Sequence, residues 1–154
     1  MRIVALLLMA AGALALGACG GAEERDEKNA YVKAVNAAQN EFSAEVASVA
    51  ARITNKSSSS EDRKTLASFQ SAIDDVVSQL RGIKVPGDVD TEHKQLVTAM
   101  SGFGAQIEKA TAALSNPSTP AIARAQQEIS TATTQVNARI DSAIAAINSK
   151  LAEK

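Results

Sequence analysis

The sequence predicts an all-α protein, an antiparallel up-and-down four-helix bundle, from three observations. Of the 154 residues 45% are hydrophobic but only 3% are aromatic, and alanine dominates the apolar residues. Alanine is the best helix former, and strand-favouring residues are sparse. Apolar residues recur at alternating spacings of three and four along four stretches, which is typical of helices that bury one face. Short polar stretches separate them, so consecutive helices should run antiparallel.

The first predicted helix follows Tyr31 and ends in a serine-rich loop over 54–60. Its seam is Val32, Val35, Gln39, Phe42, Val46, Val49 and Ile53. One polar residue on an apolar seam is typical of a register-setting or partly exposed position. We favour that interpretation of Gln39 over a ligand contact.

The second predicted helix begins at Ser60, a hydroxyl cap that is followed by two acidic residues in the first turn. Its seam is uninterrupted: Leu66, Phe69, Ile73, Val76 and Leu80. Gly82 can end the helix in the left-handed conformation, and Pro86 prevents continuation.

The third predicted helix opens at Asp88 and ends before Asn116-Pro117; the fourth has Thr119 as its cap and Pro120 as its first residue. The third seam is Val89, His93, Leu96, Met100, Phe103, Ile107, Ala110 and Leu114. The fourth is Ile122, Ala125, Ile129, Ala132, Val136, Ile140, Ala143, Ile144, Ile147 and Leu151. The alternative architecture is a long helical hairpin that dimerises into a bundle, because a core poor in aromatic residues is thin.

The N-terminal residues carry a targeting signal. After a short positive start, Ile3–Leu16 is uncharged and apolar, too short for a membrane span of about 20 residues but typical of a signal peptide. It ends in Leu16-Gly17-Ala18-Cys19, which resembles the lipobox of bacterial lipoproteins. The resemblance implies cleavage before Cys19 and attachment of diacylglycerol to its sulfur, so residues 1–18 are predicted to be a lipoprotein signal peptide.

The predicted domain organisation follows from this signal. Residues 19–28 are glycine-rich and then charged, which is typical of a flexible tether, and residues 29–154 are the helical bundle domain. Acylated Cys19 would hold the protein on the extracytoplasmic face of the cell membrane.

Composition excludes several function classes. Lys and Arg total 16 against 17 Asp and Glu, so there is no basic field for a nucleic acid. One cysteine and one histidine exclude an intramolecular disulfide, a cysteine zinc cluster and a histidine-rich metal site. There is no phosphate-binding glycine loop and no arguable Ser/His/Asp set. We expect a protein that is not an enzyme and has no cofactor.

Four polar residues near the start of the third helix are candidates for chemistry. His93 could be a ligand or a pH-sensitive group, but we favour a histidine that donates to a loop carbonyl and pins the 82–88 connection. Asp88, Asp90 and Glu92 could hold a divalent cation, but acidic residues in a first helical turn are expected from the helix dipole alone. Whether this cluster has any function stays open.

Other candidate features have ordinary explanations. Gly102 and Gly104 flank Phe103 and indicate close helix packing more than a pocket. Asp74 and Asp75 are adjacent, so on a helix their side chains diverge.

A second resemblance covers Leu80, Ile83, Val85-Pro86, Val89, His93 and Leu96-Val97. This segment is similar to one in uncharacterised helical lipoproteins of actinobacteria, from which no functional residue is carried over.

The expected function is that of a non-enzymatic, membrane-anchored interaction module of the cell envelope, with an envelope protein as partner. The alternative is an extracytoplasmic ligand-binding or sensing protein. It would hold a small apolar or lipid-like molecule between the helices near Phe42, Phe69 and Phe103. The oligomeric state is left open.

Overall fold

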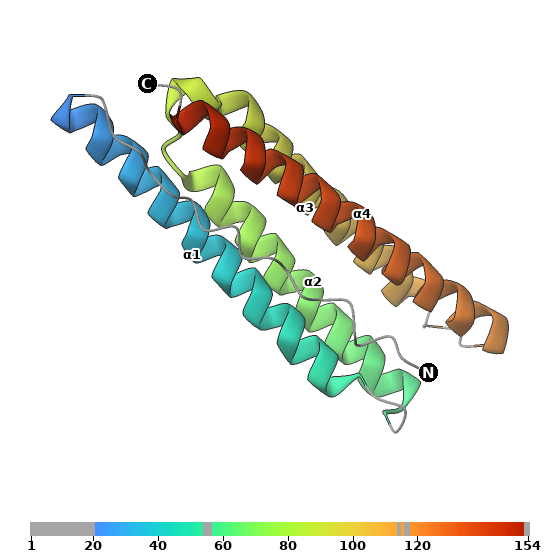
Figure 1. The fold of residues 1–154 in the computed structure, drawn as a ribbon. Helices are drawn as coiled ribbons and strands as arrows, with labels where there is room; N and C mark the ends of the chain where they lie inside the picture. The colour runs from blue at the N-terminus through green and yellow to red at the C-terminus, as the bar shows by residue number, and fades with distance from the viewer. Residues whose placement is uncertain (1–20, 54–56, 114, 116–117, 153–154) are drawn as a thin grey trace.

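The computed structural model describes residues 21–53, 57–113, 115 and 118–152, and within these ranges the chain forms four long helices and no strand. The helices are α1 (Ala22–Arg52), α2 (Ser59–Gly82), α3 (Asp90–Ala113) and α4 (Thr119–Ala152), and a short 3-10 helix, η2 (Gly87–Val89), precedes α3. Successive helices run in opposite directions (Figure 1). The predicted all-α, up-and-down four-helix bundle is therefore confirmed, and one chain supplies all four helices.

Close packing joins helices that are consecutive in the chain, namely α1 with α2, α2 with α3 and α3 with α4. α1 and α4 approach each other less closely. One end of the bundle, here called the η2 end, consists of the first turns of α1, the connection 83–89 with the start of α3, and the last turn of α4 (Figure 1). The far end consists of the last turns of α1 and α3 and the first turns of α2 and α4.

The predicted seams make the core. Every seam residue of α2 is buried, and so is every α3 seam residue from Val89 to Ala110. The described α4 seam is buried from Ala132 onwards, with Ile129 half-buried. α1 buries four of its seam residues together with two that the spacing did not include: Val32, Val35, Phe42 and Val46, with Tyr31 and Ala38. Leu114, Ile122 and Ala125 lie outside the residues whose side chains are described.

The predicted tether over 19–28 is wrong for residues 22–28, because α1 already begins at Ala22. Glu23 and Glu24 lie in the first turn, where the helix dipole favours negative charge. Lys28 Nζ lies 3.0 Å from Glu24 Oε1 one turn away, and Lys28 is 8% exposed. The charged run is thus a helical part of the bundle, which begins before residue 29.

The start of α2 also differs from the prediction, since the cap is Ser58 and not Ser60. Ser58 Oγ accepts from the Glu61 N–H at 3.3 Å, and the Glu61 carboxylate accepts from the Ser58 N–H at 2.8 Å. This reciprocal capping box needs a Glu or Gln three residues after the cap. Ser60 is followed at that spacing by Arg63, so it cannot form one.

The remaining helix ends need smaller corrections. α2 ends at Gly82 as predicted, but Gly82 is not left-handed, because no described glycine has a positive φ. The chain leaves the helix through Ile83, whose φ of −70° and ψ of 133° are extended. α3 begins at Asp90, after η2, and α4 begins at Thr119 itself, one residue before Pro120.

Candidate functional site

A buried hydrogen-bonded group lies at the η2 end and joins three helices. His93, in the first turn of α3, places Nε2 2.9 Å from the backbone oxygen of Leu80 in the last turn of α2. Its Nδ1 lies 3.2 Å from the hydroxyl of Tyr31 on α1. His93 is 4% exposed and Tyr31 is 1% exposed. Their rings meet edge to face, with centroids 5.7 Å apart.

The direction of both hydrogen bonds follows from their acceptors. A carbonyl oxygen only accepts, so Nε2 carries the proton that His93 donates to Leu80. Nδ1 of the neutral ring is then an acceptor, and the Tyr31 hydroxyl donates to it. Burial, with the nearby negative charge of Glu92, raises the pKa of Tyr31 far above its usual value. Tyr31 therefore serves as a hydrogen-bond donor and stays protonated.

The preferred interpretation of His93 is confirmed only in part. Its ring bonds a backbone carbonyl at the start of the connection to η2, although that carbonyl belongs to the last turn of α2 and not to the loop. Tyr31 was missed as its partner. The two residues are 62 positions apart, and nothing in the apolar spacing relates them.

The acidic cluster does not converge on a common point. Asp88 Oδ2 lies 3.7 Å from Lys28 Nζ, and Asp90 Oδ2 lies 2.6 Å from Lys94 Nζ. Among the described residues, no three His, Cys, Asp or Glu side chains lie where they could jointly hold a metal ion. The carboxylates at this end instead form ion pairs with lysines.

Two of these ion pairs involve largely buried side chains and join separate elements. The hydrogen bond to Glu24 raises the pKa of Lys28, with smaller contributions from Asp88. Glu92 Oε1 lies 2.9 Å from Lys150 Nζ on α4, and this hydrogen bond lowers the pKa of Glu92. Lys28 thus joins α1 to η2, and Lys150 joins α4 to α3. The links to Asp88 and Glu92 were not predicted, because these partners lie on other elements than the lysines.

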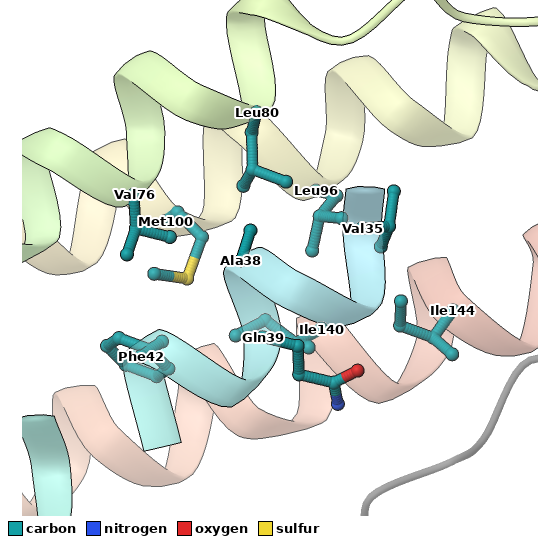
Figure 2. Close-up of a pocket in the computed structure, with 10 residues that line it drawn as sticks. All are labelled: Val35, Ala38, Gln39, Phe42, Val76, Leu80, Leu96, Met100, Ile140 and Ile144. Carbon is teal, nitrogen blue, oxygen red and sulfur yellow. The ribbon is translucent and has the colours of Figure 1, made fainter. Parts of the chain in front are cut away.

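The three phenylalanines pack against one another. The ring centroids of Phe42, Phe69 and Phe103 lie 5.9–6.1 Å apart, with one stacked and two edge-to-face pairs. The cavity beside Phe42 has a volume of only about 20 Å³ and is lined mostly by apolar side chains from all four helices (Figure 2). Such a space holds at most one water and, being apolar, stays dry. This packing argues against a ligand among these rings.

Gln39 lines the same small cavity, and the side chain is half-buried. Its amide is turned away from Leu80 and Met100 in Figure 2. Gln39 therefore occupies a partly exposed position on the seam, as predicted.

The two mid-helix glycines of α3 differ from each other. A Cβ atom at Gly104 would lie 3.2 Å from Ile73 Cγ2 on α2, whereas one at Gly102 would meet nothing within 4 Å. Close packing is confirmed for Gly104 and is wrong for Gly102. Asp74 and Asp75 are both exposed, and Asp74 accepts from Gln70 at 3.2 Å.

A groove on the side of the η2 end was not foreseen. It has a volume of about 480 Å³ and is lined by Glu27, Ala30, Tyr31, Ala34, Ile83 and Lys84. Lys84 Nζ lies 2.9 Å from Glu27 Oε1 and so joins the connection to α1. The groove needs α1 to continue back to Glu27, which the predicted tether did not allow.

Comparison with known proteins gives no assignment. No protein-family model matches the chain, and no curated protein or solved structure matches it.

Cys19 and the predicted signal peptide over 1–18 lie outside the described residues. None of the described helices is long and apolar enough to cross a membrane. Cys19 precedes the first residue of α1 by three positions. An extended chain spans at most about 3.6 Å per residue, so the Cα atom of Cys19 lies within about 11 Å of that of Ala22.

Proposed function

We propose that the protein is a membrane-anchored extracytoplasmic lipoprotein whose helical bundle is a non-enzymatic interaction module of the cell envelope. The observation that carries the proposal is the box Leu16-Gly17-Ala18-Cys19 after a short apolar run. The chain's only thiol stands where lipoproteins carry their acyl chains. Two or more acyl chains anchor a protein stably where one chain is marginal.

The helical bundle supports an interaction role over a ligand-holding one. Its phenylalanines fill the space between the helices, and its buried histidine is engaged by two partners within the protein. α1 is about 46 Å long, from 31 residues at 1.5 Å each. The bundle is therefore a rod that presents helix surfaces to other envelope proteins.

Replacement of Cys19 by Ser tests the anchor. We expect Cys19→Ser to move the protein from the membrane fraction to the soluble fraction of cells, because the serine hydroxyl cannot form the thioether. Intact-mass measurement of the purified wild-type protein should show a chain that starts at Cys19 and carries acyl groups.

Gly21→Ser is the matched control. Gly21 has a φ of −55° and open space around it, so serine fits there while the thiol is kept, and this variant should stay in the membrane fraction. An unmodified wild-type chain that still begins at Met1 would contradict the proposal.

A further inference from the structure

The short link between Cys19 and α1 restricts how the rod can stand on a membrane. A flexible tether over 19–28 would have allowed the bundle to stand roughly 30 Å away from Cys19. Because α1 starts at Ala22, the distance from Cys19 to the first residue of the bundle is at most about 11 Å. One headgroup layer is itself roughly 5–8 Å thick. A thioether at the membrane interface therefore keeps the first turn of α1, and with it the η2 end of the rod, near the headgroups.

We propose that the η2 end is the membrane-facing surface of this protein and rests on the lipid headgroups, with the far end directed away from the bilayer. This inference rests on the proposed lipid anchor and adds to it which part of the bundle meets the membrane. The occupant of this surface is the headgroup layer of the bilayer that holds the acyl chains of Cys19.

The connection at the η2 end suits such a contact. Ile83 and Val85 are half-buried aliphatic residues on either side of Lys84, whose side chain is 86% exposed. A lysine between aliphatic residues can lay its methylenes along apolar groups and keep its ammonium in the headgroup region. Basic and acidic side chains are mixed here, so the anchor, and not attraction to anionic lipids, supplies the affinity.

The sides of the rod do not suit a membrane contact. Among residues with described burial, the exposed apolar ones on the four helices are alanines, glycines and Pro120. A rod that lay flat would offer the bilayer only half-buried large aliphatic side chains, namely Val49, Val97 and Ile129, scattered among polar helix faces. The upright orientation avoids this cost.

The η2 end is also rigid enough to transmit its position to the whole rod. Tyr31 and Leu80 both bond His93 and so link α1, α2 and α3. Lys150 links α4 to Glu92 at the same end. A membrane contact at this end thus orients all four helices together.

Site-directed fluorescence tests this orientation on the full, acylated chain. The sulfur of Cys19 is blocked as a thioether, so an introduced cysteine is the single free thiol for a bimane label. The label is placed at the η2 end in Gly87→Cys, mid-rod in Ser71→Cys and at the far end in Ser60→Cys. All three residues are exposed, and a Cβ atom at Gly87 has open space. The probe is a vesicle of phosphatidylcholine and phosphatidylglycerol with a headgroup nitroxide lipid.

We expect several-fold stronger quenching at Gly87→Cys than at Ser60→Cys, with Ser71→Cys also weak. Lys84→Cys gives a second η2-end label if the cysteine at position 87 disturbs the turn. Equal quenching at all three positions would show a rod lying flat, and stronger quenching at Ser60→Cys would show the opposite orientation. Either result overturns the inference while the lipid anchor stands. A chain that intact mass shows to be unacylated would overturn the proposed function, and this inference with it.

Discussion

At the scale of single residues, the Tyr31–His93 pair decides how the η2 end is held. Each polar atom of the pair has a partner: the tyrosine hydroxyl donates to Nδ1, and Nε2 donates to the Leu80 carbonyl. A buried polar group that loses its partner costs more than the hydrogen bond was worth, because it is not returned to water. The pair therefore stabilises the bundle only while it is complete.

Tyr31→Phe tests this dependence. The variant keeps the ring but leaves Nδ1 of His93 buried without a donor, so we expect a loss of about 1–3 kcal/mol in the free energy of unfolding. Urea unfolding of the Cys19→Ser protein without its signal peptide measures it.

The matched control is Ser71→Ala, which also removes one hydroxyl. Ser71 is exposed and bonds Ala67 in its own helix, so the change should stay within about 0.5 kcal/mol. Adding His93→Leu to Tyr31→Phe should cost less than the sum of the two single changes, since both partners are then gone. Equal effects of Tyr31→Phe and Ser71→Ala would contradict this role.

At the scale of elements, the two serines near the start of α2 can be told apart. Ser58→Ala removes the side-chain acceptor of the capping box and should destabilise the protein by about 1 kcal/mol. Ser60→Ala, in the first turn, should change stability by less than about 0.5 kcal/mol. Thermal or urea unfolding of both variants measures the difference. A larger loss for Ser60→Ala would mean that Ser60, the cap predicted from the sequence, caps the helix in place of Ser58.

The glycines of α3 offer a second test of element packing. Gly102→Ala adds a methyl group in open space on an exposed helix face, and should stabilise the protein by about 0.5–1 kcal/mol. Gly104→Ala gains the same helix propensity but brings its Cβ to 3.2 Å from Ile73 Cγ2, so it should gain less or lose stability. Equal gains in urea unfolding would show that α2 and α3 can separate without cost.

The elements also show what the sequence can and cannot predict. A seam such as Leu66 to Leu80 is local and periodic, and it was predicted in full because burial of one helix face leaves a repeating pattern. The charged run before Lys28 was misjudged, because its composition suits a solvated tether equally well. What makes it helical includes the ion pair of Lys28 with Asp88, a contact between segments 60 residues apart in the chain. The capping box at Ser58 was visible as Ser-x-x-Glu and was overlooked.

At the scale of the whole molecule, the ion pairs of Glu92 and Lys28 at the η2 end contribute to the response of stability to pH. The pKa of Glu92 is lowered from its usual 4.5 by Lys150. This contribution to stability is present above about pH 4.5 and is lost as the pH falls through the folded-state pKa. The pKa of Lys28 is raised above 10.5, so its contribution is present below that value and is lost as the pH rises through the folded-state pKa.

Glu92→Gln isolates the acidic limit. The variant cannot lose a charge on acidification, so its urea midpoint should fall less than that of the parent protein between neutral pH and about pH 3. Some acid dependence should remain, because hydrogen bonds from Ser58 hold the pKa of Glu61 below its usual value at the far end. Identical pH profiles would show that the Glu92–Lys150 pair does not couple to folding.

The closest packing of each helix against its neighbour in the chain has a kinetic consequence. Each close helix pair in the bundle, α1 with α2, α2 with α3 and α3 with α4, closes through one short connection. The chain can therefore assemble hairpin by hairpin, without first bringing its distant ends together, and pays little loop-closure entropy before contacts form. Helical proteins with such local contacts fold within microseconds to milliseconds, so a newly made chain would expose its apolar seams only briefly.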